Sequence, residues 1–188
     1  MSLFQNNVVV LDTETNGLLD APWAGIVEIG AVLLDVDGHQ IDCWQMLVIT
    51  EVLDERCAEA FAVNGLTASK IESEGVQPMV ALRLFNAWLK SKGHPWLAAY
   101  GLDFDRGMLA RMGFRGHQWM PCIQATAKEA MEATGLRPWL GRKWPQPRLN
   151  EAAPFYGVTP EEPSHRALSD AATAAKVLVE IRRRGGDQ

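Results

Sequence analysis

Four consecutive apolar residues near the start of the chain, Val8 to Leu11, constrain its fold more than any other segment. Three of them are β-branched, which favours a strand, and a strand without alternating polar residues is typical of burial on both faces. Such a strand requires packed layers on either side. With 188 residues, the chain is long enough to bury a core of that kind.

The next segments predict an antiparallel meander. We expect a second strand over residues 26–34 and a third over about 40–49. Asp37-Gly38 between them is a strong hairpin signal. Three consecutive strands with tight connections therefore predict an antiparallel first half of the sheet.

From Thr67 onward the apolar residues follow the period of helices. The expected elements are helices over about 82–92, 105–112, 124–134, 149–156 and 166–184, and a buried strand over 96–100. A meander followed by alternating helices and strands predicts the α/β class, with helices packed on a mixed sheet. No internal repeat or long linker divides the chain, so we expect a single domain over residues 1–188.

Composition narrows the function classes. The net charge of −5 argues against a protein that holds long nucleic acids by phosphate neutralisation, but not against an enzyme that grips a strand end. No apolar run approaches the roughly 20 residues that span a bilayer, and the N-terminus lacks the pattern of a secretory signal. The three cysteines form no C-x-x-C pair, so we expect a cytoplasmic protein without a disulfide scaffold or a zinc site.

Asp12 and Glu14 follow the apolar segment two residues apart, so both carboxylates point to one face if the strand continues through them. Two like charges held this close disfavour each other unless a cation lies between them. Oxygen ligands of this type suit Mg²⁺ or Mn²⁺. The alternative is that Asp12 caps a turn and Glu14 is solvated.

Three further residues could complete such a site. Asp170 shares a stripe of the last helix with Ala174 and Val177, and a carboxylate on that core-facing side is costly to bury without a partner or a metal. His165 lies five residues earlier, where a loop would let its imidazole reach the same site. Asp105 follows an expected strand-to-helix junction, where the alternative role is an ordinary N-cap.

These residues resemble the motifs of a known family, the DEDDh-type (DnaQ-like) 3′–5′ exonucleases, which include the epsilon proofreading subunit of bacterial replicative polymerases. The matching segments are Asp-Thr-Glu-Thr-Asn-Gly-Leu at 12–18, Phe-Asp at 104–105 and His-Arg-Ala-Leu-Ser-Asp-Ala at 165–171, with weaker matches at 27–32, 64–67 and 149–158. The resemblance runs from Val8 to about Ile181, which is nearly the whole chain.

The resemblance implies a ribonuclease H-like fold, in which a mixed central sheet with three antiparallel first strands is flanked by helices. It also implies two Mg²⁺ or Mn²⁺ ions and release of nucleoside 5′-monophosphates from a 3′ end. The implied metal ligands are Asp12, Glu14, Asp105 and Asp170. His165 would take a proton from the attacking water. The implied contacts to the terminal nucleotide are Thr13, Asn16 and Leu18, the last as an apolar wedge.

The sequence departs from the family pattern just before the second motif. Many relatives have His-Asn a few residues before Phe104-Asp105, whereas residues 100–103 of this chain are Tyr-Gly-Leu-Asp. The change loses an asparagine contact and adds an acid, Asp103, to which the sequence assigns no role. Ser169 stands where a second acid is common, which leaves the metal ligands intact.

Three functions are compatible with these motifs. The favoured substrate is single-stranded DNA, because Thr13 between the two acids and the Asn16-Gly17 turn are closer to the DNA-directed members. The first alternative is an exoribonuclease acting on short RNA, since both kinds share the five residues. The second is a non-catalytic module that binds nucleic acid or a polymerase, which would be expected to lose some of them. A homodimer, a polymerase partner, and a role in DNA repair or DNA replication stay open.

One further segment, residues 137–148, interleaves four basic residues with Trp139 and Trp144. Basic and aromatic side chains together can stack bases and follow the phosphates of a single strand. The alternative is a proline-rich surface loop held down by its tryptophans.

Overall fold

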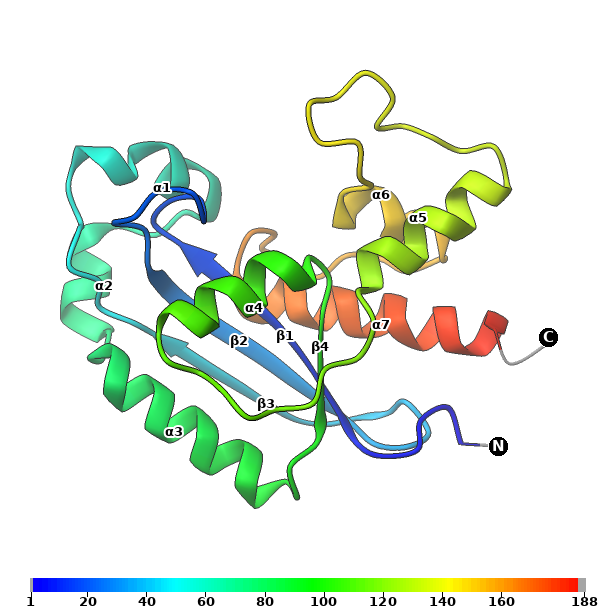
Figure 1. The fold of residues 1–188 in the computed structure, drawn as a ribbon, viewed down its shortest axis with the longest axis horizontal. Coiled ribbons are helices and arrows are strands. Elements are labelled where there is room, and N and C mark those ends of the chain that lie inside the picture. Colours follow the sequence, from blue (N-terminus) through cyan, green and yellow to red (C-terminus); the bar gives the residue numbers. More distant parts are fainter. Residues whose placement is uncertain (1, 186–188) are drawn as a thin grey trace.

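The computed structural model describes residues 2–185, which are built around a four-stranded mixed sheet (Figure 1). Its strands are β1 (Val8–Thr15), β2 (Ile26–Leu34), β3 (Gln40–Leu47) and β4 (Trp96–Ala99). Their spatial order is β3-β2-β1-β4. The first three strands are antiparallel to their neighbours, and β4 runs parallel to β1. The predicted mixed sheet with an antiparallel first half is confirmed.

Helices cover both faces of this sheet. They are α1 (Ala58–Asn64), α2 (Ala68–Glu74), α3 (Pro78–Ser91), α4 (Leu102–Arg111), α5 (Ile123–Ala133), α6 (Leu149–Phe155) and α7 (Ala167–Gly185). One core joins α5, α6 and α7 to Val8 and Val10 of β1. The other core joins α3 and α4 to Val9 and Leu11. Consecutive side chains of β1 therefore enter two separate cores, as its unbroken apolar sequence predicts.

The register of the sheet brings three chain segments to one edge. β1 and β4 are parallel, so the end of β1 and the start of α4, which follows β4, lie at the same edge. In the antiparallel pair, Asp12 is opposite Gly30 and Glu14 is opposite Glu28. Gly30 in turn touches the first turn of α7, since a Cβ added there would lie 2.2 Å from the backbone of Ala167. The starts of α4 and α7 are thus placed beside the acidic end of β1.

The apolar periodicity of the sequence does not indicate the helices in the segment between β3 and α3. This segment forms a 3₁₀ turn (Glu55–Cys57) followed by α1 and α2, each of 7 residues. Helices of that length show too few turns for an apolar period to be visible. α1 ends at Gly65, whose φ of 68° is a left-handed conformation that glycine adopts at little cost.

Several boundaries differ from the expected ones, and the helix expected over about 82–92 begins at Pro78. α4 begins at Leu102 rather than Asp105, so Asp105 lies in the first turn of the helix and is not its N-cap. β3 ends at Leu47, because the chain beyond it pairs with Val76, ahead of α3.

No helix among residues 2–185 is both long and apolar enough to cross a membrane. The expected single domain over residues 1–188 stays a prediction, and positions 1 and 186–188 of that range lie outside the described residues.

Candidate active site

Three acidic side chains from two elements meet at the end of β1. Asp12 and Glu14 lie on the same face of the strand as Val8 and Val10, which is the face that α7 covers. Asp170 lies in the first turn of α7. One carboxylate oxygen from each acid lies within 4.8 Å of the other two. The register of β1 and the position of α7 thus bring together three of the four predicted metal ligands.

The electrostatics of this cluster are unfavourable without a cation. Burial, followed by repulsion from Asp105 and Glu14, raises the pKa of Asp12 well above its ordinary value. Burial and the charge of Asp170 raise the pKa of Glu14 to about 7, and burial also raises the pKa of Asp170. Within residues 2–185, no lysine or arginine forms an ion pair with these three acids. Close, uncompensated carboxylate oxygens are the ligand set that a hard divalent cation prefers.

Asp105, the fourth predicted ligand, approaches β1 from the other face. Its Oδ1 accepts hydrogen bonds from the backbone amide of Thr13 at 3.0 Å and from the Thr13 hydroxyl at 2.8 Å. Burial raises the pKa of Asp105 to about 7, although the bonds from Thr13 act in the opposite direction. Thr13 thus fixes where the Asp105 carboxylate lies, and the charge of Asp105 contributes to the raised pKa of Asp12.

His165 precedes the first turn of α7 and is exposed. Its φ of 58° is in the left-handed region, which turns the backbone sharply just before the helix begins. The charge and the backbone amide of His165 both lower the pKa of Asp170, although burial outweighs them. His165 is thus near enough to Asp170 to act on its carboxylate, and its side chain is accessible to solvent.

An ion pair between buried Glu28 and partly exposed Arg166 fixes the start of α7 against β2. Glu28 is fully buried, and its carboxylate accepts hydrogen bonds from the guanidinium of Arg166 at 2.5 and 3.0 Å and from the Ala167 amide at 3.1 Å. Gln45 donates a further bond at 2.7 Å. Burial alone would raise the pKa of Glu28, but the bonds from Arg166 and Ala167 outweigh it and lower the pKa. No role was predicted for Glu28, Arg166 or Gln45 from the sequence.

The signal for Glu28 is nevertheless present in the sequence. It is the sole charged residue in the nine residues of β2, all of which are buried. An acid at such a position requires a cationic or hydrogen-bonding partner. The sequence does not show that Arg166 is the partner of Glu28.

A cleft of about 520 Å³ adjoins Glu14 and could receive the end of a substrate. Among its lining residues are the three predicted contacts to the terminal nucleotide, Thr13, Asn16 and Leu18. The side chain of Leu18 is 68% exposed, as an apolar wedge requires. Thr13 is buried, and its hydroxyl is already bound to Asp105.

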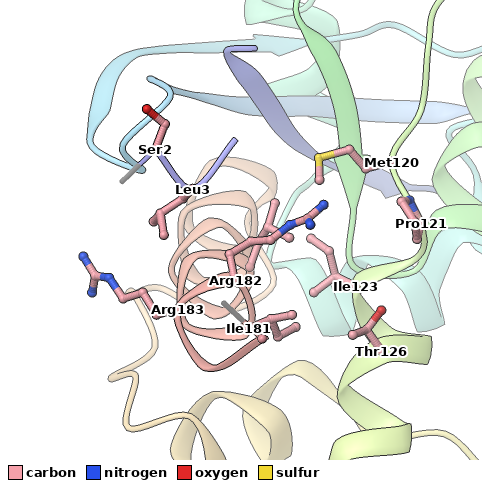
Figure 2. A pocket seen from close by; sticks show the side chains of 11 residues that line it. Ser2, Leu3, Met120, Pro121, Ile123, Thr126, Ile181, Arg182 and Arg183 are labelled. Atoms are coloured by element: carbon pink, nitrogen blue, oxygen red, sulfur yellow. The ribbon is translucent and has the colours of Figure 1, made fainter. Parts of the chain in front are cut away.

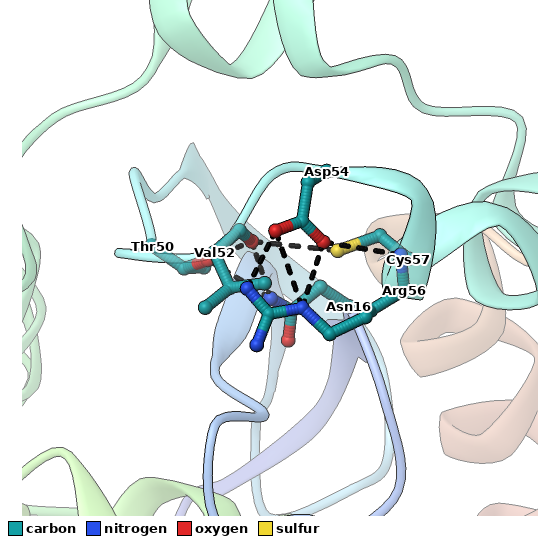
Figure 3. A network of polar contacts seen from close by, with 6 residues as sticks. All are labelled: Asn16, Thr50, Val52, Asp54, Arg56 and Cys57. Atoms are coloured by element: carbon teal, nitrogen blue, oxygen red, sulfur yellow. Dashed lines mark hydrogen bonds and ion pairs between the residues drawn. The ribbon is translucent and has the colours of Figure 1, made fainter.

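The side chain of Asn16 has a different use from the predicted one. Its amide donates to the Val52 carbonyl at 2.7 Å and to the Thr50 hydroxyl at 3.0 Å, and its carbonyl accepts from the Gly25 amide at 2.7 Å. Figure 3 shows Asn16 together with the loop that carries Thr50 and Val52. Asn16 is fully buried, and its backbone amide donates to the Gly25 carbonyl at 3.1 Å, so its bonds hold the wall of the cleft.

A second hollow, of about 550 Å³, lies at the other end of α7 (Figure 2). Arg182 lines it, and Arg182 is separated from Asp170 by about 18 Å along the helix axis. None of the predicted site residues lines this hollow. The predicted site residues therefore lie at the edge of the sheet and not at this hollow.

Comparison with known proteins agrees with this assignment. The RNase_T exonuclease family model matches residues 9–178. Exonuclease I from Methylocaldum szegediense superimposes with a TM-score of 0.76 at 18% identity, over 96% of this chain and 41% of that one. E. coli exonuclease I in complex with single-stranded DNA gives 0.73 at 14% identity, over 97% and 41%. The nuclease domain of 3′hExo, a DEDDh family member bound to rAMP, gives 0.69 at 17% identity, over 96% and 93%.

The chain thus spans less than half of the two exonuclease I chains and nearly all of the 3′hExo nuclease domain. A search of curated protein sequences found no match. The solved structures confirm the ribonuclease H-like fold, and the matched residues 9–178 contain all five predicted catalytic residues. The chain therefore belongs to the RNase_T exonuclease family.

Proposed function

We propose that this exonuclease removes nucleotides from the 3′ end of single-stranded DNA and releases nucleoside 5′-monophosphates with the help of two Mg²⁺ or Mn²⁺ ions. The observation that carries the proposal is the cluster formed by Asp12, Glu14 and Asp170, whose oxygens lie within 4.8 Å of one another without a basic partner among residues 2–185. The family fold supports the assignment of this cluster to phosphodiester hydrolysis.

The donor set fits divalent cations with a preference for oxygen. Asp12, Glu14 and Asp170 would hold one ion, and Asp105, which repels Asp12 and keeps one oxygen outside its bonds to Thr13, would complete the ligands for two. Bound Mg²⁺ or Mn²⁺ supplies charge stabilisation for the attacking and leaving oxygens of an in-line displacement.

The residues of the chain itself would move the proton and place the strand. An imidazole nitrogen of His165 takes a proton from water as the water oxygen forms a bond to phosphorus. The bond between phosphorus and the 3′ oxygen of the preceding nucleotide breaks, and that oxygen is protonated from solvent. Leu18 rests against the terminal base in the cleft beside Glu14, so that the scissile phosphate faces the acids.

The preference for DNA rests on the first motif and the turn that follows it. The Asp12-Thr13-Glu14 sequence and the Asn16-Gly17 turn resemble the DNA-directed members of the family. Structures that share the fold include both an exonuclease I bound to single-stranded DNA and a 3′-exonuclease that recognises a histone mRNA stem-loop. A nucleic acid is therefore the partner that this proposal requires, with DNA favoured over RNA.

The test is digestion of 5′-labelled DNA and RNA of matched sequence with Mg²⁺ or Mn²⁺, in single-stranded and duplex form. We expect a ladder that shortens from the 3′ end, fastest for single-stranded DNA. An Asp12→Asn variant with an unchanged circular dichroism spectrum serves as the control and should give no ladder. If RNA is cleaved faster than DNA, the substrate is RNA and the DNA assignment is wrong. If no substrate is cleaved, the proposed exonuclease activity is overturned.

A further inference from the structure

Residues 137–148, which join α5 to α6, carry a charge opposite to that of the whole protein. The segment contains Arg137, Arg142, Lys143 and Arg148 and no acidic residue, in a chain with a net charge of −5. Figure 1 shows it as a loop that arches outward from α5 and α6. We refer to it as the 137–148 loop.

The base of the 137–148 loop is firmly attached to the protein. The Trp139 side chain is 2% exposed and belongs to the core shared by α5, α6 and α7. The Pro147 carbonyl accepts hydrogen bonds from the Tyr100 hydroxyl at 3.1 Å and from the Gln124 amide at 2.9 Å. The loop is therefore attached to the protein at Trp139 and at Pro147.

Arg142 also belongs to the attachment. Its guanidinium donates two hydrogen bonds to the carboxylate of Glu151 on α6, at 2.9 and 2.5 Å. The same carboxylate accepts from the backbone amide of Arg148 at 2.8 Å. Arg142 is therefore used within the protein, although its position in the sequence suggests a contact to phosphate.

The tip of the 137–148 loop, around residues 140–144, is in contrast exposed to solvent. The side chains of Leu140 and Trp144 are 72% and 73% exposed, while Trp139 is buried. The ammonium of Lys143 lies over the indole of Trp144, 5.4 Å from the ring centroid. The two alternatives from the sequence thus apply to different tryptophans, since Trp139 holds the loop down and Trp144 presents its ring to solvent.

We propose that Lys143 and Trp144 bind the single strand upstream of the 3′ end that enters the active site, with a base stacked on Trp144 and a phosphate beside Lys143. The proposal rests on the proposed function above. A lysine beside an exposed aromatic face, in a loop without acids, is the combination that places a phosphate and stacks a base of a single strand. α6, which begins where the loop ends, packs against α7, the helix that carries Asp170.

The experiment measures the Kd of a fluorescent single-stranded DNA of roughly 16 nucleotides in EDTA, where no hydrolysis occurs. Trp144→Ala should raise the Kd by about fivefold to a hundredfold, the range expected for loss of one base–aromatic stack. Trp144→Phe, which keeps an aromatic face, should stay within about threefold of the wild type. Lys143→Ala should reduce the slope of log Kd against log salt by about 0.7, whereas Lys90→Ala, an exposed lysine on α3, should leave it unchanged.

The outcomes separate this proposal from the proposed function. Wild-type Kd values in both Trp144→Ala and Lys143→Ala would overturn the loop proposal, even if the enzyme degrades DNA normally. An inactive wild type that still loses strand affinity on Trp144→Ala would overturn the exonuclease mechanism alone. If Trp144→Ala changes the molecular mass measured by light scattering while the Kd stays constant, the loop is a contact between copies of the chain and the proposal is wrong.

Discussion

The buried carboxylate of Glu28 and the guanidinium of Arg166 form two hydrogen bonds, at 2.5 and 3.0 Å, which fasten the start of α7 to β2. His165 immediately precedes Arg166 in the sequence, and Asp170 follows Arg166 by one helical turn. The ion pair therefore sets the position of two site residues although neither of its members belongs to the acidic cluster.

The first prediction concerns this ion pair. Arg166→Met leaves the Glu28 charge buried without its main partner, so we expect the free energy of unfolding to fall by about 3–5 kcal/mol. Turnover should fall as well, since α7 loses the contact that places Asp170. Urea unfolding followed by circular dichroism measures the first effect, and hydrolysis of labelled DNA the second.

The matched control is the double variant Glu28→Gln with Arg166→Met, which removes the buried charge together with its partner. Its stability should recover at least half of the loss, because no unpaired ion remains. If Arg166→Met alone lost less than about 1 kcal/mol, the pair would not fix α7.

The second prediction concerns the metal ligands. Asp12→Asn and Asp170→Asn should each lower the turnover number by at least about a thousandfold, because a divalent ion supplies several kcal/mol of charge stabilisation to the transition state. Both variants should be folded and, without metal, at least as stable as the wild type, since each removes a repelled charge. Isothermal titration with Mn²⁺ should show weakened binding in both, and wild-type turnover in either would remove that residue from the ligand set.

The third prediction follows from the raised pKa values in the cluster. Burial and the Asp170 charge raise the pKa of Glu14 to about 7, and burial raises that of Asp105 to about 7. The metal-free folded protein therefore holds protons that the unfolded chain releases near pH 4 to 4.5, so its free energy of unfolding falls as pH rises between these values and about 7. Mn²⁺ binds the deprotonated acids, so the rise in Tm that it causes should grow with pH over this window.

Glu14→Gln isolates one part of this effect. The variant should be less sensitive to pH between about 4.5 and 7 without metal, and more stable than the wild type at pH 7 by on the order of 1 kcal/mol. Identical pH profiles of Tm for the two proteins in EDTA would show that Glu14 is charged throughout this range.

The fold could be predicted from the sequence where local patterns encode it. The β-branched run of β1, the Asp37-Gly38 turn and the alanine-rich α7 each indicate their own structure, and the order of elements then limits the sheet to few arrangements. Apolar periodicity does not indicate α1 and α2, because their 7 residues each contain too few turns. The two acids Asp12 and Glu14 were found because their spacing fits the period of a strand.

The rest of the site depends on contacts between distant residues. Glu28 and Arg166 are 138 residues apart, and Thr13 and Asp105 are 92 apart. Taken alone, each of these residues has an ordinary alternative role, such as the N-cap for Asp105. The contacts it makes instead depend on the register of β1 with β2 and on the approach of α4 to β1. The use of Asn16 as a support for the cleft wall has the same origin, since Val52 reaches it through the turn after β3.

The fourth prediction separates proton transfer from metal binding at His165. Removing the imidazole should lower turnover by about 10²–10⁴-fold, the usual contribution of a general base, and leave Mn²⁺ affinity close to that of the wild type. His165 has a φ of 58°, so His165→Ala would add backbone strain of roughly 1–2 kcal/mol and confuse the result. His165→Asn is the better variant, because asparagine tolerates the left-handed conformation, and His165→Gly serves as its strain-free control. Equal, large losses of turnover in both, with Mn²⁺ titrations unchanged, would identify the imidazole as the missing group, whereas a matching loss of metal affinity would make His165 a support for Asp170 instead of a base.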